Sequence, residues 1–152
     1  QILAEAPEAI APPVTVALSA KASSSAAEAP AILVVDEDDA ILASMAFLLK
    51  TWGYLVLAAR SLPEAHQLVV ENGSRLSAAL VDFHLSSQEN GIEVAAMLRG
   101  QLGTDFPVAI VTGDTTPEVM AAVHDARLVL LHKPANAQAM QNFVASARPM
   151  AG

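Results

Sequence analysis

The chain contains no cysteine, so disulfide bridges and thiolate metal sites are excluded. Aromatic residues make up only 4% of its 152 residues, and the formal net charge is −8. A nucleic-acid partner is therefore disfavoured, because neutralising phosphates requires clustered Lys and Arg side chains. No apolar run approaches the roughly 20 residues of a membrane span, so we expect no membrane contact by this segment. These absences fit a cytoplasmic chain.

The chain is rich in small apolar side chains. Of its residues, 53% are hydrophobic and 16% are charged, a balance that can fill a core. The length suits one ordinary domain. Residues 1–30 are rich in Ala, Pro and Ser, so we interpret them as a linker or tail. We expect one domain over residues 31–147, followed by a short C-terminal tail, residues 148–152.

Five short apolar runs, several of them rich in Val and Ile, have the length of β-strands. They are Ile32–Val35, Tyr54–Ala59, Ala78–Val81, Val108–Val111 and Leu128–Leu131. Their hydrophobicity is nearly continuous along each run, not alternating. This pattern is typical of parallel strands that are covered on both faces.

Helix signals lie between and after these runs. The first is the helical spacing of Ile41, Met45 and Leu48. The second is a capping box over Ser61–Glu64, which opens a helix that ends near Asn72 with Gly73 after it. The others are the stretch Gly91–Arg99, a helix that begins with Thr116 as N-cap before Pro117, and a last helix capped by Asn136. Strands alternating with helices at this spacing predict an α/β fold with a doubly wound parallel sheet.

Polar side chains follow four of the five predicted strands. They are the acidic run Asp36–Asp39, then Asp82, then Thr112-Gly113-Asp114, then His132-Lys133-Pro134. Ligands bind at the carboxyl ends of strands in open parallel sheets, so we expect these groups to form one site. Carboxylates gathered at one edge repel unless a cation lies between them, and oxygen ligands favour Mg²⁺ over zinc. A Lys and a Thr hydroxyl there suit a phosphoryl group, which a carboxylate can accept.

Each of these signals also has an ordinary structural explanation. Acids such as Asp36–Asp39 favour a helix N-terminus, and a lone Asp82 after a strand is common in turns. Thr112 fits a strand interior, and Lys133 fits a surface loop. The argument for a site rests on all four signals falling after different strands in the expected order.

These residues resemble the receiver domain of bacterial response regulators over residues 31–147. Ile32–Glu37 looks like the first strand and acidic pair of that family, and Leu80–Leu85 looks like the end of its phosphoacceptor strand. Ile110–Gly113 matches the strand that ends in a hydroxyl, and Leu131–Pro134 matches the lysine–proline signature. The resemblance implies a flavodoxin-like (βα)5 fold with strand order 2-1-3-4-5 and helices on both faces of the sheet.

The resemblance also implies a reaction in two-component phosphorelay signalling. The carboxylate of Asp82 would accept a phosphoryl group from a phosphohistidine or a small phosphodonor. Lys133 would pair with the phosphoryl oxygens, and Thr112 would hydrogen-bond one of them. The domain would promote its own phosphorylation and would not act as a separate enzyme. The Lys133–Pro134 peptide bond would be cis.

The cofactor that the resemblance implies is Mg²⁺. Its ligands would be Glu37, Asp82 and the backbone carbonyl of His84, with Asp36 acting through water. Three positions depart from the family pattern. Glu37 stands where Asp is usual, Leu130 stands where a switch aromatic is common, and the bulky His84 lies two residues after the acceptor, where it either alters the rate of phosphoryl loss or simply covers the loop.

The implied partner is a histidine kinase or a histidine phosphotransfer domain, and a homodimer is possible. We expect a histidine-bearing helix bundle to dock on a patch of Ala40, Ile41, Ala43 and Ser44. The alanine- and proline-rich lead-in and a chain that stops after the last helix look like the C-terminal receiver of a hybrid sensor histidine kinase. A stand-alone receiver with an N-terminal tail is the alternative.

Two rival functions stay open. Asp36-Glu37-Asp38 also resembles the motif of haloacid-dehalogenase-like phosphatases, in which Asp36 would be phosphorylated, although that interpretation leaves Asp82 without a role. The second rival is a degenerate receiver that only binds partners.

Overall fold

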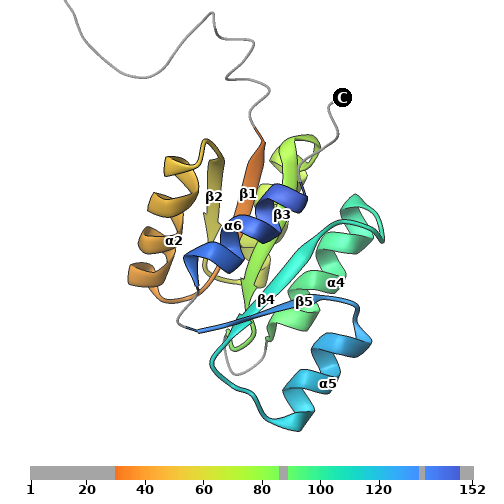
Figure 1. The fold of residues 1–152 in the computed structure, drawn as a ribbon. Coiled ribbons are helices and arrows are strands. Elements are labelled where there is room, and N and C mark those ends of the chain that lie inside the picture. The colour runs from red at the N-terminus through yellow and green to blue at the C-terminus, as the bar shows by residue number, and fades with distance from the viewer. Residues whose placement is uncertain (1–29, 86–88, 134–135, 148–152) are drawn as a thin grey trace, which may run out of the picture.

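The computed structural model describes residues 30–85, 89–133 and 136–147, in which strands and helices alternate (Figure 1). The strands are β1 (Ala31–Val35), β2 (Leu55–Ala59), β3 (Leu76–Asp82), β4 (Val108–Thr112) and β5 (Val129–His132). The helices are α2 (Asp39–Thr51), α3 (Leu62–Asn72), α4 (Gly91–Leu102), α5 (Pro117–Asp125) and α6 (Ala137–Ser146), and a short 3₁₀ turn, η1, spans Gly73–Arg75. Each predicted strand and helix is present, with ends that differ by a few residues. Nearly all of the predicted linker and the whole predicted C-terminal tail lie outside the described residues.

The strands form one parallel sheet in the order β2-β1-β3-β4-β5. β1 pairs with β2 on one side and with β3 on the other, so that Val35 lies opposite both Ala59 and Val81. At the far side of β4, Thr112 pairs with His132. The predicted fold class and strand order are confirmed.

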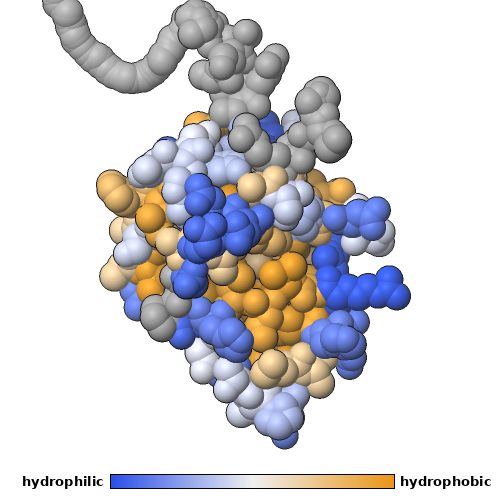
Figure 2. Space-filling view, in the orientation of Figure 1, coloured by the Kyte–Doolittle hydropathy of each residue, from blue (hydrophilic) through white to orange (hydrophobic). Residues whose placement is uncertain are grey.

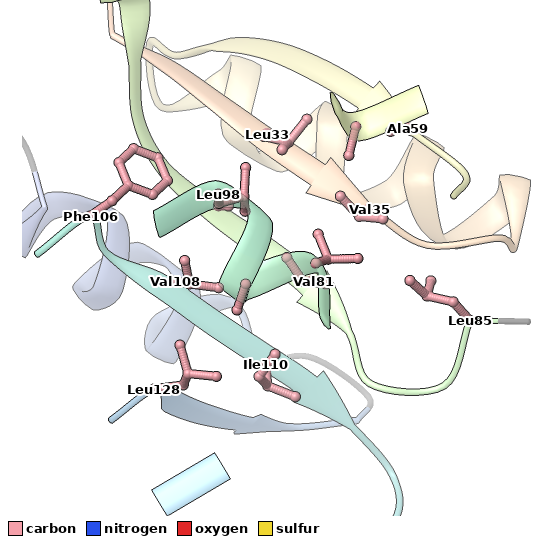
Figure 3. Close-up of a cluster of buried hydrophobic side chains, with 14 of the residues drawn as sticks. Leu33, Val35, Ala59, Val81, Leu85, Leu98, Phe106, Val108, Ile110 and Leu128 are labelled. Atoms are coloured by element: carbon pink, nitrogen blue, oxygen red, sulfur yellow. The ribbon is translucent and has the colours of Figure 1, made fainter. Parts of the chain in front are cut away.

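Helices cover both faces of the sheet (Figure 1). Ile32 and Val34 of β1 point into a core cluster with α2 and α6, whereas Leu33 and Val35 point into a cluster with α3, α4 and α5. Successive residues of a strand face opposite sides, so one continuous apolar strand supplies both clusters. Figure 3 shows the second cluster, in which Leu98 of α4 lies among side chains of β1, β3 and β4.

The expectation that every strand is covered on both faces is wrong for the two edge strands. β1 and β4 are buried along their whole length, but most residues of β2 and β5 are exposed or half-buried. An edge strand has a neighbouring strand on one side only, so its other side stays open to solvent. Figure 2 shows hydrophobic side chains at the surface beside α6, over β4 and β5, and Val129 of β5 is 45% exposed.

The helix caps follow the sequence with two corrections. The predicted capping box at Ser61 is half formed: Ser61 accepts a hydrogen bond from the Glu64 N–H, but the Glu64 carboxylate accepts from the Arg60 N–H, one residue too early. Gly73 has a right-handed backbone, so it continues into η1 and is not a left-handed cap. Thr116 and Asn136 cap α5 and α6 as predicted. No helix in the described ranges is long and apolar enough to cross a bilayer.

Candidate functional site

The polar groups predicted from the sequence meet at the carboxyl edge of the sheet. Asp36 directly follows β1, Asp82 ends β3, Thr112 ends β4 and Lys133 follows β5. β1, β3, β4 and β5 are consecutive neighbours in a parallel sheet, so their ends fall side by side. Since these residues lie far apart in the chain, the strand order alone brings them together.

Lys133 joins the two central carboxylates. Its Nζ lies 3.1 Å from Asp82 Oδ1 and 3.5 Å from Asp36 Oδ2. Asp36 is 3% exposed and Asp82 is 6% exposed, so two acids are buried beside a single ammonium group. Buried charges need partners, and one cation compensates only one of the two carboxylates.

The pKa values of these groups reflect this imbalance. Burial raises the pKa of Asp82, and the nearby Asp36 charge raises it further, although hydrogen bonds from Lys133 and the His84 backbone oppose the shift. Burial lowers the pKa of Lys133, but the hydrogen bond and charge of Asp82, together with Asp36, outweigh this effect and leave that pKa raised. The lysine therefore stays charged at neutral pH, and the site favours further positive charge.

The acidic residues that follow β1 have different partners in the structure. Asp36 faces the site, and its Oδ1 also accepts a hydrogen bond of 2.9 Å from the Asp38 N–H. Asp38 caps α2 by accepting from the N–H groups of Ala40 and Ile41, so the helix-start interpretation is correct for this residue. Glu37 is exposed, and the structure does not bring its side chain into the Lys133 cluster.

Thr112 is 1% exposed at the end of β4. Its Oγ1 accepts a hydrogen bond of 2.9 Å from the Asp114 N–H, and its backbone carbonyl accepts one of 2.9 Å from the Lys133 N–H. The second bond holds the start of the β5–α6 connection against β4. Thr112 therefore belongs to the site, and its backbone helps to place the lysine.

Two contacts of the site were not predicted, although Asp114 itself was placed at this edge from the sequence. Asp114 binds the His84 ring, with Nε2 of His84 lying 2.9 Å from Oδ2 of Asp114. Gly91 starts α4 so close to β3 that a Cβ there would lie 2.6 Å from the Asp82 carbonyl oxygen. The only sequence signals were an Asp two residues after Thr112 and a Gly at the start of a helix.

The oxygen donors at this edge fit Mg²⁺. Two buried carboxylates with one ammonium leave an unbalanced negative charge, and Mg²⁺ usually takes one or two carboxylates and keeps several waters. Among the described residues, no group of three or more acidic or histidine side chains is placed to hold a metal. The fit therefore rests on Asp36 and Asp82, and the exposed Glu37 and a backbone carbonyl would have to complete the set.

Leu130, at the position of the expected switch aromatic, is half-buried against the core cluster of α3, α4 and α5. The predicted cis bond before Pro134 lies outside the described residues.

The fold and the site together define an open, doubly wound α/β domain with a carboxylate–lysine site at the carboxyl edge of its sheet. A family model for the response regulator receiver domain matches residues 32–145. The chain belongs to the response regulator receiver domain family, and a role in two-component signalling follows from that membership.

Solved structures agree with this assignment. A chemotaxis protein, CheY4, of Vibrio cholerae aligns with a TM-score of 0.70 at 21% identity, over 79% of this chain and 99% of that one. At such identity the likeness concerns the fold alone. The signal receiver domain of an HD domain-containing protein from Pseudomonas fluorescens Pf-5 aligns with a TM-score of 0.70 at 25% identity, over 78% of this chain and 94% of that one.

A third similar structure is the signal receiver domain of a modulated diguanylate cyclase from Desulfovibrio desulfuricans G20, with a TM-score of 0.67 at 26% identity over 78% of this chain and 93% of that one. A search of curated protein sequences found no match.

Proposed function

We propose that Asp82 accepts a phosphoryl group from the phosphohistidine of a histidine kinase or histidine phosphotransfer domain. The observation that carries this proposal is the contact of 3.1 Å between Lys133 Nζ and Asp82 Oδ1 at a buried edge of the sheet. A carboxylate beside a fixed ammonium is a nucleophile with a cation in place for the oxygens of the incoming group.

In the transfer, the P–N bond of the donor imidazole breaks as a P–O bond forms to an Asp82 oxygen. The donor ring keeps the electron pair of the broken bond, and its nitrogen takes up a proton from solvent. Lys133 exchanges its contact with Asp82 for the phosphoryl oxygens, and the Thr112 hydroxyl donates to one of them. The protein mainly positions these groups, so it needs no separate acid or base.

Mg²⁺ would be held by Asp82, Glu37 and the His84 carbonyl, with Asp36 acting through water, and would neutralise charge on the transferring group. Asp36 also has a role without the metal, because its carboxylate lies 3.5 Å from Lys133 Nζ and is a second acidic partner of the lysine. Both functions make Asp36 a supporting residue of the acceptor site.

The direct test is the intact mass of the protein after incubation with acetyl phosphate and Mg²⁺. We expect one phosphoryl group that needs the metal and is absent from Asp82→Asn. Retention of the adduct in Asp82→Asn would contradict the proposal and favour the rival phosphatase chemistry at Asp36. No adduct from either acetyl phosphate or a phosphorylated histidine domain would favour a receiver that only binds partners.

The partner surface that we propose is a groove along α2. It has a volume of about 550 Å³, and its lining comes mainly from α2: Ala40, Ile41, Ser44, Met45 and Leu48, with Val111, Lys133 and Met140 at its floor and end. Lys133 belongs both to this groove and to the acceptor site, so a helix that docks here lies next to Asp82. Of the patch predicted from the sequence, Ala43 does not line the groove.

Ile41→Arg tests this surface because it places a long charged side chain in the groove. We expect transfer from a phosphorylated histidine domain to slow by at least tenfold, while phosphorylation by acetyl phosphate changes little. Val70→Arg is the matched control, since Val70 is 64% exposed on α3, which covers the other face of the sheet. Equal effects of both variants, or none from Ile41→Arg, would contradict the docking proposal.

A further inference from the structure

A side-chain bond spans the two loops that follow β3 and β4. His84 Nε2 lies 2.9 Å from Asp114 Oδ2. A backbone hydrogen bond from Thr116, followed by the bond from His84, holds the pKa of Asp114 below its usual value. Because an ionised carboxylate can only accept, His84 donates from Nε2. The loop after the acceptor strand is thereby tied to the loop after the hydroxyl strand.

Asp114 is held by more than this bond. Its Oδ1 accepts a hydrogen bond of 3.0 Å from the Thr116 N–H, and Thr116 in turn caps α5 through the Val119 N–H. The backbone N–H of Asp114 donates to Thr112 Oγ1 at 2.9 Å. Asp114 therefore links His84, the start of α5 and the Thr112 hydroxyl.

This arrangement determines what the Thr112 hydroxyl can do. A hydroxyl has one donor and two acceptor positions, and the Asp114 N–H takes one acceptor position. Its proton remains available, while the position of the oxygen is set by the Asp114 backbone. A donor that is placed before the reaction needs no reorganisation when charge develops on the phosphoryl group.

His84 also contacts the acceptor itself. Its backbone donates a hydrogen bond to the Asp82 carboxylate, and its ring packs edge-on against Phe83 with centroids 4.8 Å apart. One residue thus touches Asp82 through its backbone and reaches the loop of Thr112 through its side chain. The pair of His84 and Asp114 therefore links the loop that follows Asp82 to the loop that follows Thr112.

We propose that His84 and Asp114 are positioning residues for phosphoryl transfer, and that the bond between them holds the Thr112 hydroxyl at a set distance from Asp82. This inference rests on the proposed function of Asp82. Neither residue exchanges a proton with the phosphoryl group or forms a bond to it, so the transfer reaction itself is unchanged.

The test uses the full chain and two readouts. The first is the rate of phosphorylation by acetyl phosphate with Mg²⁺, and the second is the exchange rate of the Asp114 N–H, measured by nuclear magnetic resonance without a phosphodonor. His84→Ala removes the donor, whereas His84→Gln offers an amide N–H near the position of Nε2. His66→Ala is the matched control, because His66 is exposed on α3, away from the site.

We expect His84→Ala to slow phosphorylation about threefold to tenfold and to speed Asp114 exchange by a similar factor, the scale of one partly exposed hydrogen bond. His84→Gln should recover both, and His66→Ala should change neither. In Asp114→Ala, adding His84→Ala should slow the reaction no further, because both changes remove the same bond.

Unchanged Asp114 exchange in His84→Ala would overturn the inference, whatever happens to the rate. Faster exchange with an unchanged rate would overturn it also, since the bond would then be structural only. If the wild-type chain takes up no phosphoryl group from any donor, the proposed function fails. Positioning for transfer fails with it, even if the exchange data show that the bond still holds Thr112.

Discussion

The ammonium group of Lys133 lies 3.1 Å from Asp82 Oδ1, across β4 from the strand that carries the aspartate. It also lies 3.5 Å from Asp36 Oδ2, so that one cation is shared by two acids that are almost fully buried. Folding alone places these three charges together. The stability of the domain and the proposed phosphoryl transfer therefore depend on the same three side chains.

Replacing the lysine tests this dependence. Lys133→Met keeps the length of the side chain but leaves two buried carboxylates without their cation, which should lower the free energy of unfolding by about 1–3 kcal/mol. Urea denaturation at neutral pH measures the loss, and Lys50→Met on α2 serves as a control for loss of an exposed lysine. Equal stability of the two variants would show that the cation is not needed for folding.

The raised pKa of Asp82 predicts how stability depends on pH. A carboxyl whose pKa is raised on folding binds more protons in the folded state, so stability falls as pH rises from the usual value of 3.8 through the folded pKa. Asp82→Asn removes this penalty and should melt at a higher temperature than the wild type at pH 7. The gap should narrow as pH falls towards 3.8; a gap that is constant with pH would contradict the assignment.

Gly91 lies where α4 packs closely against the end of β3, and substitutions at this position test that packing. A Cβ at this position would lie 2.6 Å from the Asp82 carbonyl oxygen, so Gly91→Ala should destabilise the domain by about 1–3 kcal/mol. Gly100→Ala in the same helix is the control, because its Cβ meets nothing within 4 Å and should stabilise by up to about 1 kcal/mol. Chemical denaturation of both variants measures the change in the free energy of unfolding. Changes of the same sign in the two variants would contradict the close packing at Gly91.

Mg²⁺ should stabilise the folded state if the two carboxylates hold it. We expect the melting temperature to rise with Mg²⁺ concentration and to return to its starting value after chelation. Asp36→Asn should weaken this response, whereas Glu71→Gln on α3 should leave it intact. NaCl at matched ionic strength separates binding from general screening, and an equal rise with NaCl would argue against a specific site.

The sequence predicted the elements well because each strand is a short apolar run and because α3, α5 and α6 begin at caps that the sequence shows. It also predicted Asp36, Asp82, Thr112 and Lys133 as one group, since parallel strands end at the same edge. The exposure of Val129 was missed, because apolar residues look alike whether or not a helix reaches over the sheet edge.

The contact between His84 and Asp114 could not be predicted because it joins two loops whose separation depends on the pairing of β3 with β4. The close approach at Gly91 has the same origin, since it depends on where α4 packs against the end of β3. The capping box at Asn90 and Glu93 was also missed, although both of its hydrogen bonds are formed. Asn is a good N-cap and Glu93 follows three residues later, so the pattern of a capping box is present in the sequence.

The sheet separates the two cores, and this division has an evolutionary consequence. The groove along α2 belongs to the face covered by α2 and α6, whereas the loops that bear His84 and Asp114 lead into α4 and α5 on the opposite face. On the proposed roles, substitutions that alter docking would fall mainly on the layer of α2 and α6, and those that alter the rate of phosphoryl transfer would fall mainly on the loops of the other layer. Duplicated copies of such a gene could then change their docking surface without altering the residues proposed to position the transfer.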